Sequence, residues 1–253
     1  MPREEEQIRA RAEDLMRRCR EQYRLTASGF LDLHQQSAVR AWLREDSGPE
    51  GRLAGGYEEA ERRLLLCVPD YLAAPEAHPE EEAIAVLRVH WRQRPAPTHR
   101  DLLGALLGLG IRRETVGDIL VREDGADILV LREMAEFLAV HFCRAGRAEL
   151  TVGIVPLSEL RVPPARTREI RDTVASPRLD TVTAAAFGLS RARAAAAVRR
   201  GIVFVNGEQV MKADRQLEEG DRLVLRGSGK AVLTRIGGRS RKGRLYICLQ
   251  RYL

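Results

Sequence analysis

A cluster of arginines on an alanine-rich segment has the clearest chemistry in this sequence. Arg191, Arg193, Arg199 and Arg200 surround a run of small residues, Ala194–Ala197. At about 100° per helical residue, Arg193 and Arg200 share one face. Guanidinium groups bind phosphate oxygens in a bidentate way, and small side chains let a helix approach a sugar-phosphate backbone. The segment predicts a phosphate-binding helix; the alternative is a packing helix with its arginines in solvent.

Basic residues are concentrated in the C-terminal part of the chain. From Arg178 to Leu253 there are 16 Lys and Arg against 6 Asp and Glu, a net charge of +10, whereas the first 177 residues carry 26 against 30, a net of −4. This asymmetry indicates a polyanion partner, because each neutralised phosphate releases condensed counterions; the alternative is a solvated basic surface. The candidate residues for binding such a polyanion are Arg178, Ser190, Arg191, Arg193, Arg199, Arg200, Asn206, Lys212, Arg226, Lys230, Arg239, Arg241 and Lys242.

Two parts of this set have a second explanation. Arg178 and Asp180 can simply open a helix, with Leu179 in the core and Asp180 near the positive helix end. The tail from Arg226 to Arg244 alternates basic residues with glycine. Such a tail can follow an irregular RNA backbone closely, or it can be a solvated hairpin.

A second candidate surface lies in the middle of the chain, at His99, Arg100, Arg112 and Arg113. His99-Arg100-Asp101 is similar to the catalytic loop of protein kinases, but the other kinase motifs are absent. Thr98 and Asp101 have the spacing of a capping box, which predicts a helix start. No phosphate loop, nucleophile elbow or dinucleotide-binding glycine pattern is present. We therefore expect no catalytic residues and no cofactor.

The four cysteines and the apolar pattern narrow the class of protein further. Cys19, Cys67, Cys143 and Cys248 form no Cys-x-x-Cys pair and have no nearby His pair at zinc-ligand spacing. We expect reduced thiols and no metal site. The N-terminus is charged, and no apolar run approaches the roughly 18 residues of a membrane span, which predicts a cytoplasmic protein without a membrane partner.

Residues 1–79 are predicted to form a mainly helical region. Apolar residues amid dense charge favour an exposed amphipathic helix over Ile8–Tyr23, and a second helix is expected over about Asp32–Arg44. A loop follows at Asp46–Gly51, and a third helix is expected over Glu58–Leu66, before Pro69. Two prolines indicate a linker at Ala73–Pro79.

Residues 80–156 predict a ferredoxin-like domain, the class that includes the RNA-recognition-motif (RRM) fold. An RRM stacks bases on aromatic residues of its central strands; here Trp91 is the sole candidate, so we expect little base stacking. The expected elements, in the order β-α-β-β-α-β, are Ala83–Trp91, Thr98–Leu109, Thr115–Val121, Asp127–Leu131, Glu133–Arg144 and Ala148–Val155.

The remainder predicts a linker at residues 157–172, with a short strand near Glu169–Val174, and a small α+β domain at residues 173–253. Ser190 and Gly201 have the types expected at the N-cap and just past the end of the second helix. The expected helices are Leu179–Phe187 and Arg191–Arg200, and the strands are Ile202–Val205, Glu208–Val210, Arg222–Arg226, Val232–Ile236 and Leu245–Gln250. The fold class of the whole chain is therefore α+β.

Several fixed-spacing elements of the last domain resemble the RNA-binding module named after small-subunit ribosomal protein S4. They are Ser176–Asp180, Ser190–Arg193, Val198–Gly207 and Gly220–Leu223. The resemblance implies binding of structured RNA through the two helices and the following turn.

Four upstream segments, Gly55–Arg62, His99–Leu106, Leu109–Glu114 and Gly117–Ile119, resemble the YlmH family. This resemblance implies a protein of the bacterial translation machinery, associated with the large ribosomal subunit and with the handling of stalled peptidyl-tRNA complexes. Ribosomal RNA and transfer RNA are the implied partners, and DNA is not expected. Two alternatives stay open: an RNA-modifying enzyme carrying the same module, such as a pseudouridine synthase or methyltransferase, and an adaptor in cell division.

Overall fold

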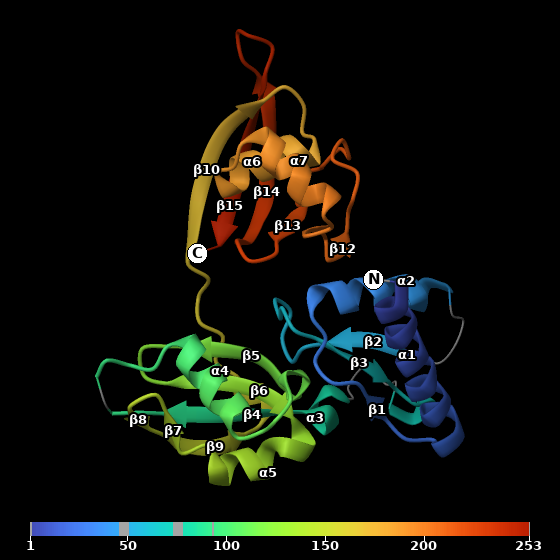
Figure 1. Ribbon diagram of the computed structural model, residues 1–253, viewed down its shortest axis with the longest axis vertical. Helices are drawn as coiled ribbons and strands as arrows, with labels where there is room; N and C mark the ends of the chain where they lie inside the picture. The colour runs from blue at the N-terminus through green and yellow to red at the C-terminus, as the bar shows by residue number, and fades with distance from the viewer. Residues whose placement is uncertain (1, 46–50, 73–77, 93, 253) are drawn as a thin grey trace. The chain divides into compact units, whose positions relative to one another are not determined.

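The computed structural model describes residues 2–45, 51–72, 78–92 and 94–252. The chain divides into two compact units, Met1–Pro163 and Pro164–Leu253, and each is described by itself (Figure 1). The loop expected at Asp46–Gly51 and the linker expected at Ala73–Pro79 lie largely outside the described residues. No helix in the described part of the chain is long and apolar enough to cross a membrane.

The first unit begins with two helices, α1 (Pro2–Gln22) and α2 (Leu33–Glu45), which confirm the two expected there. Helix α1 was expected to be exposed, but its apolar residues are buried. Met16 is 3% exposed and Cys19 is 1% exposed, and both pack with Trp42 of α2. Charged residues of the same helix, such as Arg9, Glu13 and Arg17, are exposed.

The helix expected over Glu58–Leu66 is wrong, because Leu64–Cys67 forms strand β3. This strand is the centre of a three-stranded sheet, between β1 (Thr26–Ala27) and β2 (Gly51–Ala54). Leu65 and Cys67 face one core cluster, while Leu64 and Leu66 face another. A strand buried on both faces is apolar throughout, so its sequence lacks the alternation that distinguishes a strand from a buried helix. A 3-10 turn, η1 (Asp70–Leu72), follows.

The ferredoxin-like domain has the expected element order and the sheet order β5-β6-β4-β9. Thr98 caps α4 in a capping box with Asp101, as its spacing predicted. The helix expected over Glu133–Arg144 ends earlier, at His141, because the next residues form a small hairpin. The elements are α3 (Glu80–Ala83), β4 (Ile84–His90), α4 (His99–Gly108), η2 (Arg113–Thr115), β5 (Val116–Val121), β6 (Ala126–Leu131), α5 (Arg132–His141), β7 (Arg144–Ala145), β8 (Ala148–Glu149), β9 (Thr151–Val155) and η3 (Leu157–Glu159).

Both faces of this sheet are covered. Alternate residues such as Leu87 and Ile128 pack under α4 and α5. On the other face, Ile84 and Leu129 are fully buried in a cluster that includes Phe30, Leu64 and Leu66 of the N-terminal region. The N-terminal region thus covers the sheet face that an RRM leaves open for bases.

The second unit is a six-stranded antiparallel sheet in the order β10-β15-β14-β13-β11-β12. Helices α6 and α7 pack on this sheet over one core that includes Leu179, Val198, Leu223 and Leu249. The two expected helices are confirmed. The elements are β10 (Thr167–Val174), α6 (Leu179–Phe187), α7 (Arg191–Arg199), β11 (Val203–Val205), β12 (Glu208–Gln209), β13 (Arg222–Leu225), β14 (Gly229–Arg239) and β15 (Leu245–Tyr252).

The short strand expected near Glu169–Val174 is present, and it begins earlier, inside the linker expected at residues 157–172. Strand β10 begins at Thr167 and pairs with β15 along its whole length, from Thr167 opposite Tyr252 to Val174 opposite Leu245. Because β10 is an edge strand with mostly exposed, charged side chains, it buries too little apolar surface to show the alternation of a typical strand.

Candidate nucleic-acid interface

The candidate interface in the second unit is organised around the buried carboxylate of Asp180, in the first turn of α6. Arg178 donates to it from Nε (3.2 Å) and Nη2 (3.4 Å), and Arg191 of α7 donates from Nε (2.9 Å). The Asp180 side chain is only 5% exposed, whereas those of Arg178 and Arg191 are 34% and 60% exposed. One buried acid therefore fixes two guanidinium groups at the surface.

Burial by itself would raise the pKa of Asp180, but the hydrogen bonds from Arg191 and Arg178 outweigh it, and the pKa is lowered. The carboxylate is therefore ionised at neutral pH. One negative charge against two guanidinium groups leaves a net positive charge at this place. Each guanidinium has five N–H donors, and the bonds to Asp180 use two from Arg178 and one from Arg191, so donors remain for a phosphate.

Three more arginines lie on the solvated side of α7. Ala194, Ala197 and Val198 are buried, while Arg193, Arg199 and the C-cap residue Arg200 are exposed. The exposed face of the helix carries Ala192 between these arginines, and the run from Arg191 to Arg200 contains no acidic residue. This confirms the slim, basic helix face that the sequence predicted; its contact with RNA stays a prediction.

Two of the candidate residues have structural roles. Ser190 is the N-cap of α7, and its Oγ accepts a hydrogen bond from the Arg193 N–H (3.3 Å). Asn206 adopts a positive φ of 53° in the turn between β11 and β12. Its amide donates to Asp221 (2.7 Å) and accepts from the Arg222 N–H (2.9 Å), which braces this turn against β13.

Backbone hydrogen bonds place Lys212 and Arg226 near helices α6 and α7. The Asp180 N–H donates to the carbonyl of Ala213, which places exposed Lys212 beside the start of α6. The Arg226 N–H donates to the carbonyl of Ile202, which places Arg226 beside the end of α7. Lys230 lies at the start of β14, four residues after Arg226, and its Nζ is 4.7 Å from the centre of the Tyr252 ring.

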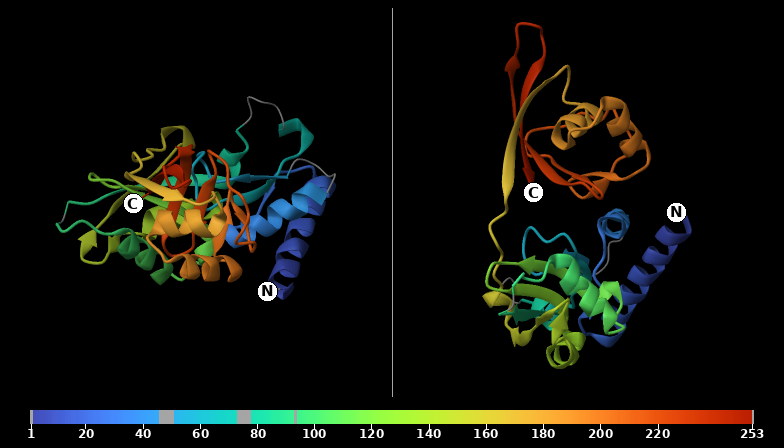
Figure 2. Two further views of the ribbon diagram at one scale, coloured as in Figure 1. Left: turned by 90° about the horizontal axis from the view of Figure 1, so that it is seen from above. Right: turned by 60° about the vertical axis from the view of Figure 1, so that its left-hand side comes forward.

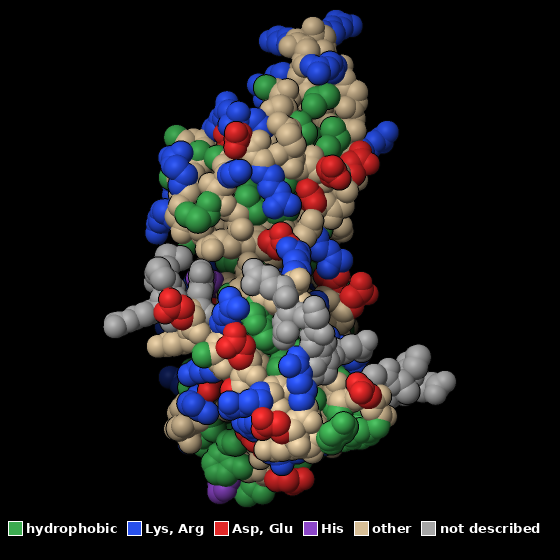
Figure 3. All heavy atoms as spheres, turned by 90° about the vertical axis from the view of Figure 1, so that its right-hand side faces the viewer, with side chains coloured by type: hydrophobic (Ala, Val, Ile, Leu, Met, Phe, Trp, Pro, Cys, Tyr) green, Lys and Arg blue, Asp and Glu red, His purple; other side chains and the backbone are tan. Residues whose placement is uncertain are grey.

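The remaining candidates, Arg239, Arg241 and Lys242, form a separate group at the tip of the β14–β15 hairpin. Figure 2 shows this hairpin extending past the rest of the unit, and Figure 3 shows Lys and Arg side chains gathered at its tip. Strand β14 has 11 residues and so places its two ends roughly 30 Å apart. The hairpin tip therefore lies far from Arg226 and Lys230, and the candidate residues form two surfaces rather than one.

The sheet of the ferredoxin-like domain, by contrast, offers no open face to RNA. Beside the apolar cover, the fully buried Asp127 accepts hydrogen bonds from Arg88 (3.0 and 3.1 Å) and from the Arg161 N–H (2.8 Å). Arg122 forms an ion pair with the same carboxylate at 3.1 Å. Trp91, the expected stacking candidate, packs against the helix-side core.

The second candidate surface is only partly assembled. Arg112 is 80% exposed and pairs with Glu114 at 3.0 Å, whereas Arg113 turns inward to the carbonyl of Val116. Partial burial lowers the pKa of His99, and the positive charge of Arg113 lowers it further, so these two side chains are near neighbours. Arg100 is exposed at the start of α4.

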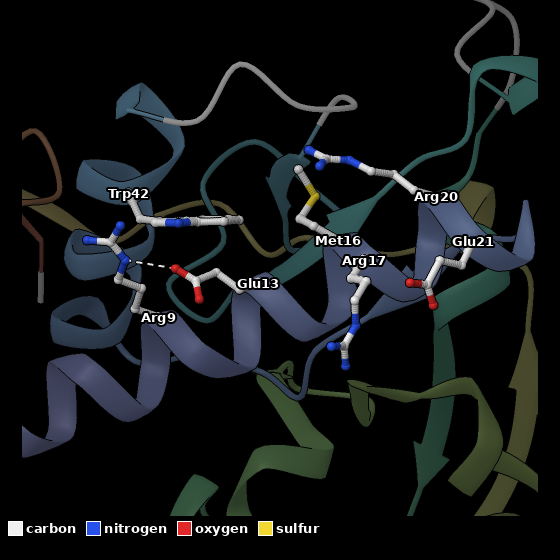
Figure 4. Close-up of a pocket in the computed structure, with 7 residues that line it drawn as sticks. All are labelled: Arg9, Glu13, Met16, Arg17, Arg20, Glu21 and Trp42. Atoms are coloured by element: carbon white, nitrogen blue, oxygen red, sulfur yellow. Dashed lines mark hydrogen bonds and ion pairs between the residues drawn. The ribbon is translucent and has the colours of Figure 1, made fainter.

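A groove between α1 and α2 has a volume of about 420 Å³ and could hold a ligand. Met16 and Trp42 lie among charged residues of both signs, and Arg9 bonds Glu13 at 2.9 Å (Figure 4). This mixture gives no preference for an anion or a cation. Within the described residues, no group of three His, Cys, Asp or Glu side chains is placed to hold a metal ion.

The role of Asp180 in positioning the two arginines was not predicted from the sequence. Asp180 was expected to lie at the start of a helix, and its partner Arg191 is 11 residues away on another helix. The signal was present in the pair Arg178 and Asp180, an acid beside a basic residue at the start of a helix. The packing of α6 against α7, which brings Asp180 and Arg191 together, is a tertiary feature.

Comparison with known proteins agrees with this organisation. Residues 79–159 match the family model described as "Putative RNA-binding domain in YlmH", and residues 177–223 match the S4 domain. The ribosome-associated protein quality control protein P2 of Bacillus subtilis is 34% identical over 232 residues, which cover 91% of this chain and 89% of that protein. The chain belongs to the YlmH family. Both resemblances seen in the sequence are therefore confirmed.

The YlmH fold is also present in a solved structure, cell division protein ylmH from Streptococcus pneumoniae. It superposes with a TM-score of 0.51 at 22% identity and covers 63% of this chain and 95% of that one. At this identity the likeness supports the fold alone. None of these YlmH relatives or family models is described as an enzyme.

Proposed function

We propose that this protein binds structured RNA on the bacterial ribosome, in the cytoplasm, and takes part in the handling of stalled peptidyl-tRNA complexes. Ribosomal RNA of the large subunit and transfer RNA are its proposed ligands. The name of the B. subtilis relative, which covers nearly the whole chain, supports the process. The S4 domain and the basic C-terminal unit support the RNA.

The observation that carries this proposal is the arginine surface around Asp180. Arg178 and Arg191 are held in place before any ligand arrives, so less side-chain entropy is lost when a phosphate binds. Arg193, Arg199 and Arg200 extend the surface along α7. Contacts of this kind read the course of the backbone rather than base identity, as expected for a ligand recognised by its shape.

The test is RNA binding by the full chain with Arg193, Arg199 and Arg200 all replaced by Gln. Each lost phosphate contact should reduce the slope of log K against log salt by about 0.7 to 0.9. Affinity for ribosomal RNA and transfer RNA should therefore fall most at low salt. The fold should be retained, because these side chains are exposed and Gln is a good helix former.

The matched control is a triple Gln variant of Arg9, Arg17 and Arg18 on α1, which removes the same charge from exposed positions in the first unit. An equal loss of affinity in both variants would mean that RNA responds only to net charge, and the proposed interface would be wrong. Crosslinking in cells and sequencing of the bound RNA would identify the ligand. Enrichment of messenger RNA alone would contradict the ribosomal role.

A binding function, rather than RNA modification, is the proposed activity. The two matched domains are binding modules, and the buried polar cluster at Asp127 is engaged in structural hydrogen bonds. Ribosomal and transfer RNA incubated with the protein should keep their mass and nucleoside composition. Release of a modified nucleoside would favour the enzyme alternative.

A further inference from the structure

An aromatic ring, that of Tyr246 in β15, is exposed on the outer face of the second unit's sheet, the face turned away from α6 and α7. The two helices pack on the other face, against residues such as Ile247 and Leu249 (Figure 2). Successive residues of a strand point to opposite faces, so Tyr246 points away from the helices, and it is 53% exposed. A ring in this position adds little to the core but can stack on a planar ligand.

The neighbouring strands leave the Tyr246 ring accessible. On β14, a bulge places Gly237 and Gly238 opposite this single tyrosine. A Cβ on Gly237 would lie 3.4 Å from the Tyr246 Cβ, so any larger residue there would set a side chain directly beside the tyrosine. On β10, the residue opposite Tyr246 is the small Thr173. The ring therefore has no large side chain directly across from it on either neighbouring strand.

Two arginines lie next to Tyr246 on this face. Arg244 precedes it by two residues, and its Nε donates to the Thr173 hydroxyl (3.1 Å) while its Nη2 donates to the Thr173 carbonyl. These bonds fix the guanidinium group and use two of its five donors. Arg235 of β14 is exposed and lies opposite Cys248, the residue of β15 that follows Tyr246 on the same face. Phosphates on either side of a base stacked on Tyr246 would thus meet guanidinium groups.

The charge of this region remains positive when its acids are counted. Glu169 is paired with Arg171 at 2.8 Å, so these two charges cancel. The hairpin from Gly229 to Tyr252 contains no Asp or Glu. Its five exposed basic residues from Arg235 to Arg244 outnumber the other acids of the adjoining segments, Asp172, Glu218 and Glu219. A polyanion therefore fits this face better than an acidic or purely apolar partner does.

We propose that Tyr246 stacks on an unpaired RNA base, and that Arg235 and Arg244 hold the phosphates next to that base. This inference rests on the proposed function, because it adds a contact to the same RNA. The site lies on a sheet face that is open, unlike the sheet of the ferredoxin-like domain, which is covered on both faces. Every base has a π-face, so the site selects unpaired nucleotides rather than a base sequence.

The test measures binding of the full chain to two RNA duplexes with the same base pairs, one blunt and one with a single-stranded 3′ extension. The wild type should bind the extended RNA more tightly. Tyr246→Ala should lower affinity for the extended RNA about five- to tenfold, because one base–aromatic stack is lost, and should leave the blunt RNA unaffected. Tyr246→Phe keeps the ring and should bind both RNAs as the wild type does. The matched control is Tyr71→Ala, at a tyrosine of the first unit that is 62% exposed, and it should have no effect.

Equal affinity of the wild type for the two duplexes would overturn the stacking site and leave the proposed function standing. Binding of neither duplex would contradict both. The triple Gln variant of Arg193, Arg199 and Arg200 should weaken binding of both duplexes but keep the preference for the extended one. Loss of that preference would place the unpaired nucleotides on α7 and overturn the assignment to Tyr246.

Salt dependence separates the ring from the arginines. Tyr246→Ala should leave the slope of log K against log salt unchanged, because stacking releases no counterions. Arg244→Gln should reduce the slope by about 0.7, the value for one phosphate of a single strand. An unchanged slope in the Arg244→Gln variant would overturn the proposed phosphate contact.

A fluorescent adenine analogue in the extension reports stacking directly, because its emission is quenched when it stacks. The wild type should quench this emission and Tyr246→Ala should not; equal quenching by both would overturn the proposal. If Tyr246→Ala unfolds the second unit, Tyr246→Ile replaces it, since a β-branched residue suits a strand and has no ring. Unchanged RNA affinity in a folded variant without the ring, with weaker binding to whole large ribosomal subunits, would assign this face to a protein contact and overturn the stacking site.

Discussion

Each unit of this protein contains a buried carboxylate held by two arginines, and the two clusters differ in exposure. In the first unit Asp127 binds Arg88 and Arg122, whose side chains are 11% and 13% exposed. In the second unit Asp180 binds Arg178 and Arg191, which are 34% and 60% exposed. The chemistry of the two clusters is the same. The first ties the sheet to the segment that covers it, and the second presents guanidinium groups to solvent.

The comparison shows that a count of arginines does not locate an RNA surface. A guanidinium contributes to phosphate binding only when some of its donors reach solvent after the structural bonds are made. In the first cluster, the Nη2 group of Arg122 is buried and is not available to a ligand. In the second cluster, Asp180 fixes Arg178 and Arg191 at the surface. Fixed side chains lose less conformational entropy when they bind a phosphate, which favours binding.

The largest effect is expected from Asp127→Asn. Removing this charge deprives two buried guanidinium groups of the buried carboxylate that they share, and breaking a buried pair in this way costs about 3 to 5 kcal/mol. Both tryptophans of the chain, Trp42 and Trp91, lie in the first unit, so Trp fluorescence during urea unfolding reports that unit selectively. Asp124→Asn, at an exposed carboxylate paired with Arg122, is the control and should cost far less. Equal losses would remove the structural role assigned to Asp127.

The same cluster predicts a dependence on pH. Burial by itself would raise the pKa of Asp127, but hydrogen bonds from Arg88, the Arg161 backbone and Arg122 outweigh it, and the folded-state pKa is lowered. A lowered pKa contributes stability that is present above the unfolded-state value of about 3.9 and is lost as pH falls through the folded-state value. The urea midpoint of the first unit should therefore drop in acid. Asp127→Asn should show a shallower drop, and a parallel one would contradict the prediction.

Asp180→Asn should have a smaller effect on stability and a larger one on function. Its partners are substantially exposed, so solvent screens the pairs and the loss of stability should be about 1 kcal/mol. RNA affinity should nevertheless fall about tenfold, or about 1.4 kcal/mol, because Arg178 and Arg191 lose their fixed positions. Amide exchange in α6 measures the first quantity, and RNA titration of the full chain measures the second. Stronger RNA binding would show that Asp180 only neutralises the arginines.

The contrast between these clusters could be predicted from the sequence only in part. The order of the ferredoxin-like elements followed from local signals, such as the capping box at Thr98 and Asp101, and so did α7 with its Ser190 cap. The basic face of α7 followed from helical periodicity. These features depend on residues within one or two turns of each other, which is the range over which a single sequence is informative.

The features that were missed depend on contacts between distant segments. Strand β3 was expected to be a helix because Leu64–Cys67 is buried on both faces. Strand β10 was expected only as a short strand near Glu169–Val174, because its pairing with β15 joins segments about 80 residues apart in the sequence. The cover over the sheet could not be predicted from the strand itself. In the sequence, Leu129 is an ordinary apolar strand residue, and its burial against Phe30 and Leu64 depends on contacts with the N-terminal region.

The smallest effect concerns Ser190, which was expected to contact RNA and whose hydroxyl caps α7. Ser190→Ala should cost about 1 kcal/mol of stability, because the Arg193 N–H loses its acceptor, with little direct effect on RNA affinity. Ser190→Asp separates capping from RNA contact, since Asp caps a helix as well as Ser does but adds a negative charge beside Arg191. If α7 lies on phosphates, this variant should be as stable as the wild type and bind RNA several-fold more weakly, most clearly at low salt. The matched control in the first unit is Thr98→Asp, at the N-cap of α4, and it should leave RNA affinity nearly unchanged. Wild-type affinity in a stable Ser190→Asp protein would place the RNA away from the start of α7 and restrict the interface to Arg199, Arg200 and Arg226.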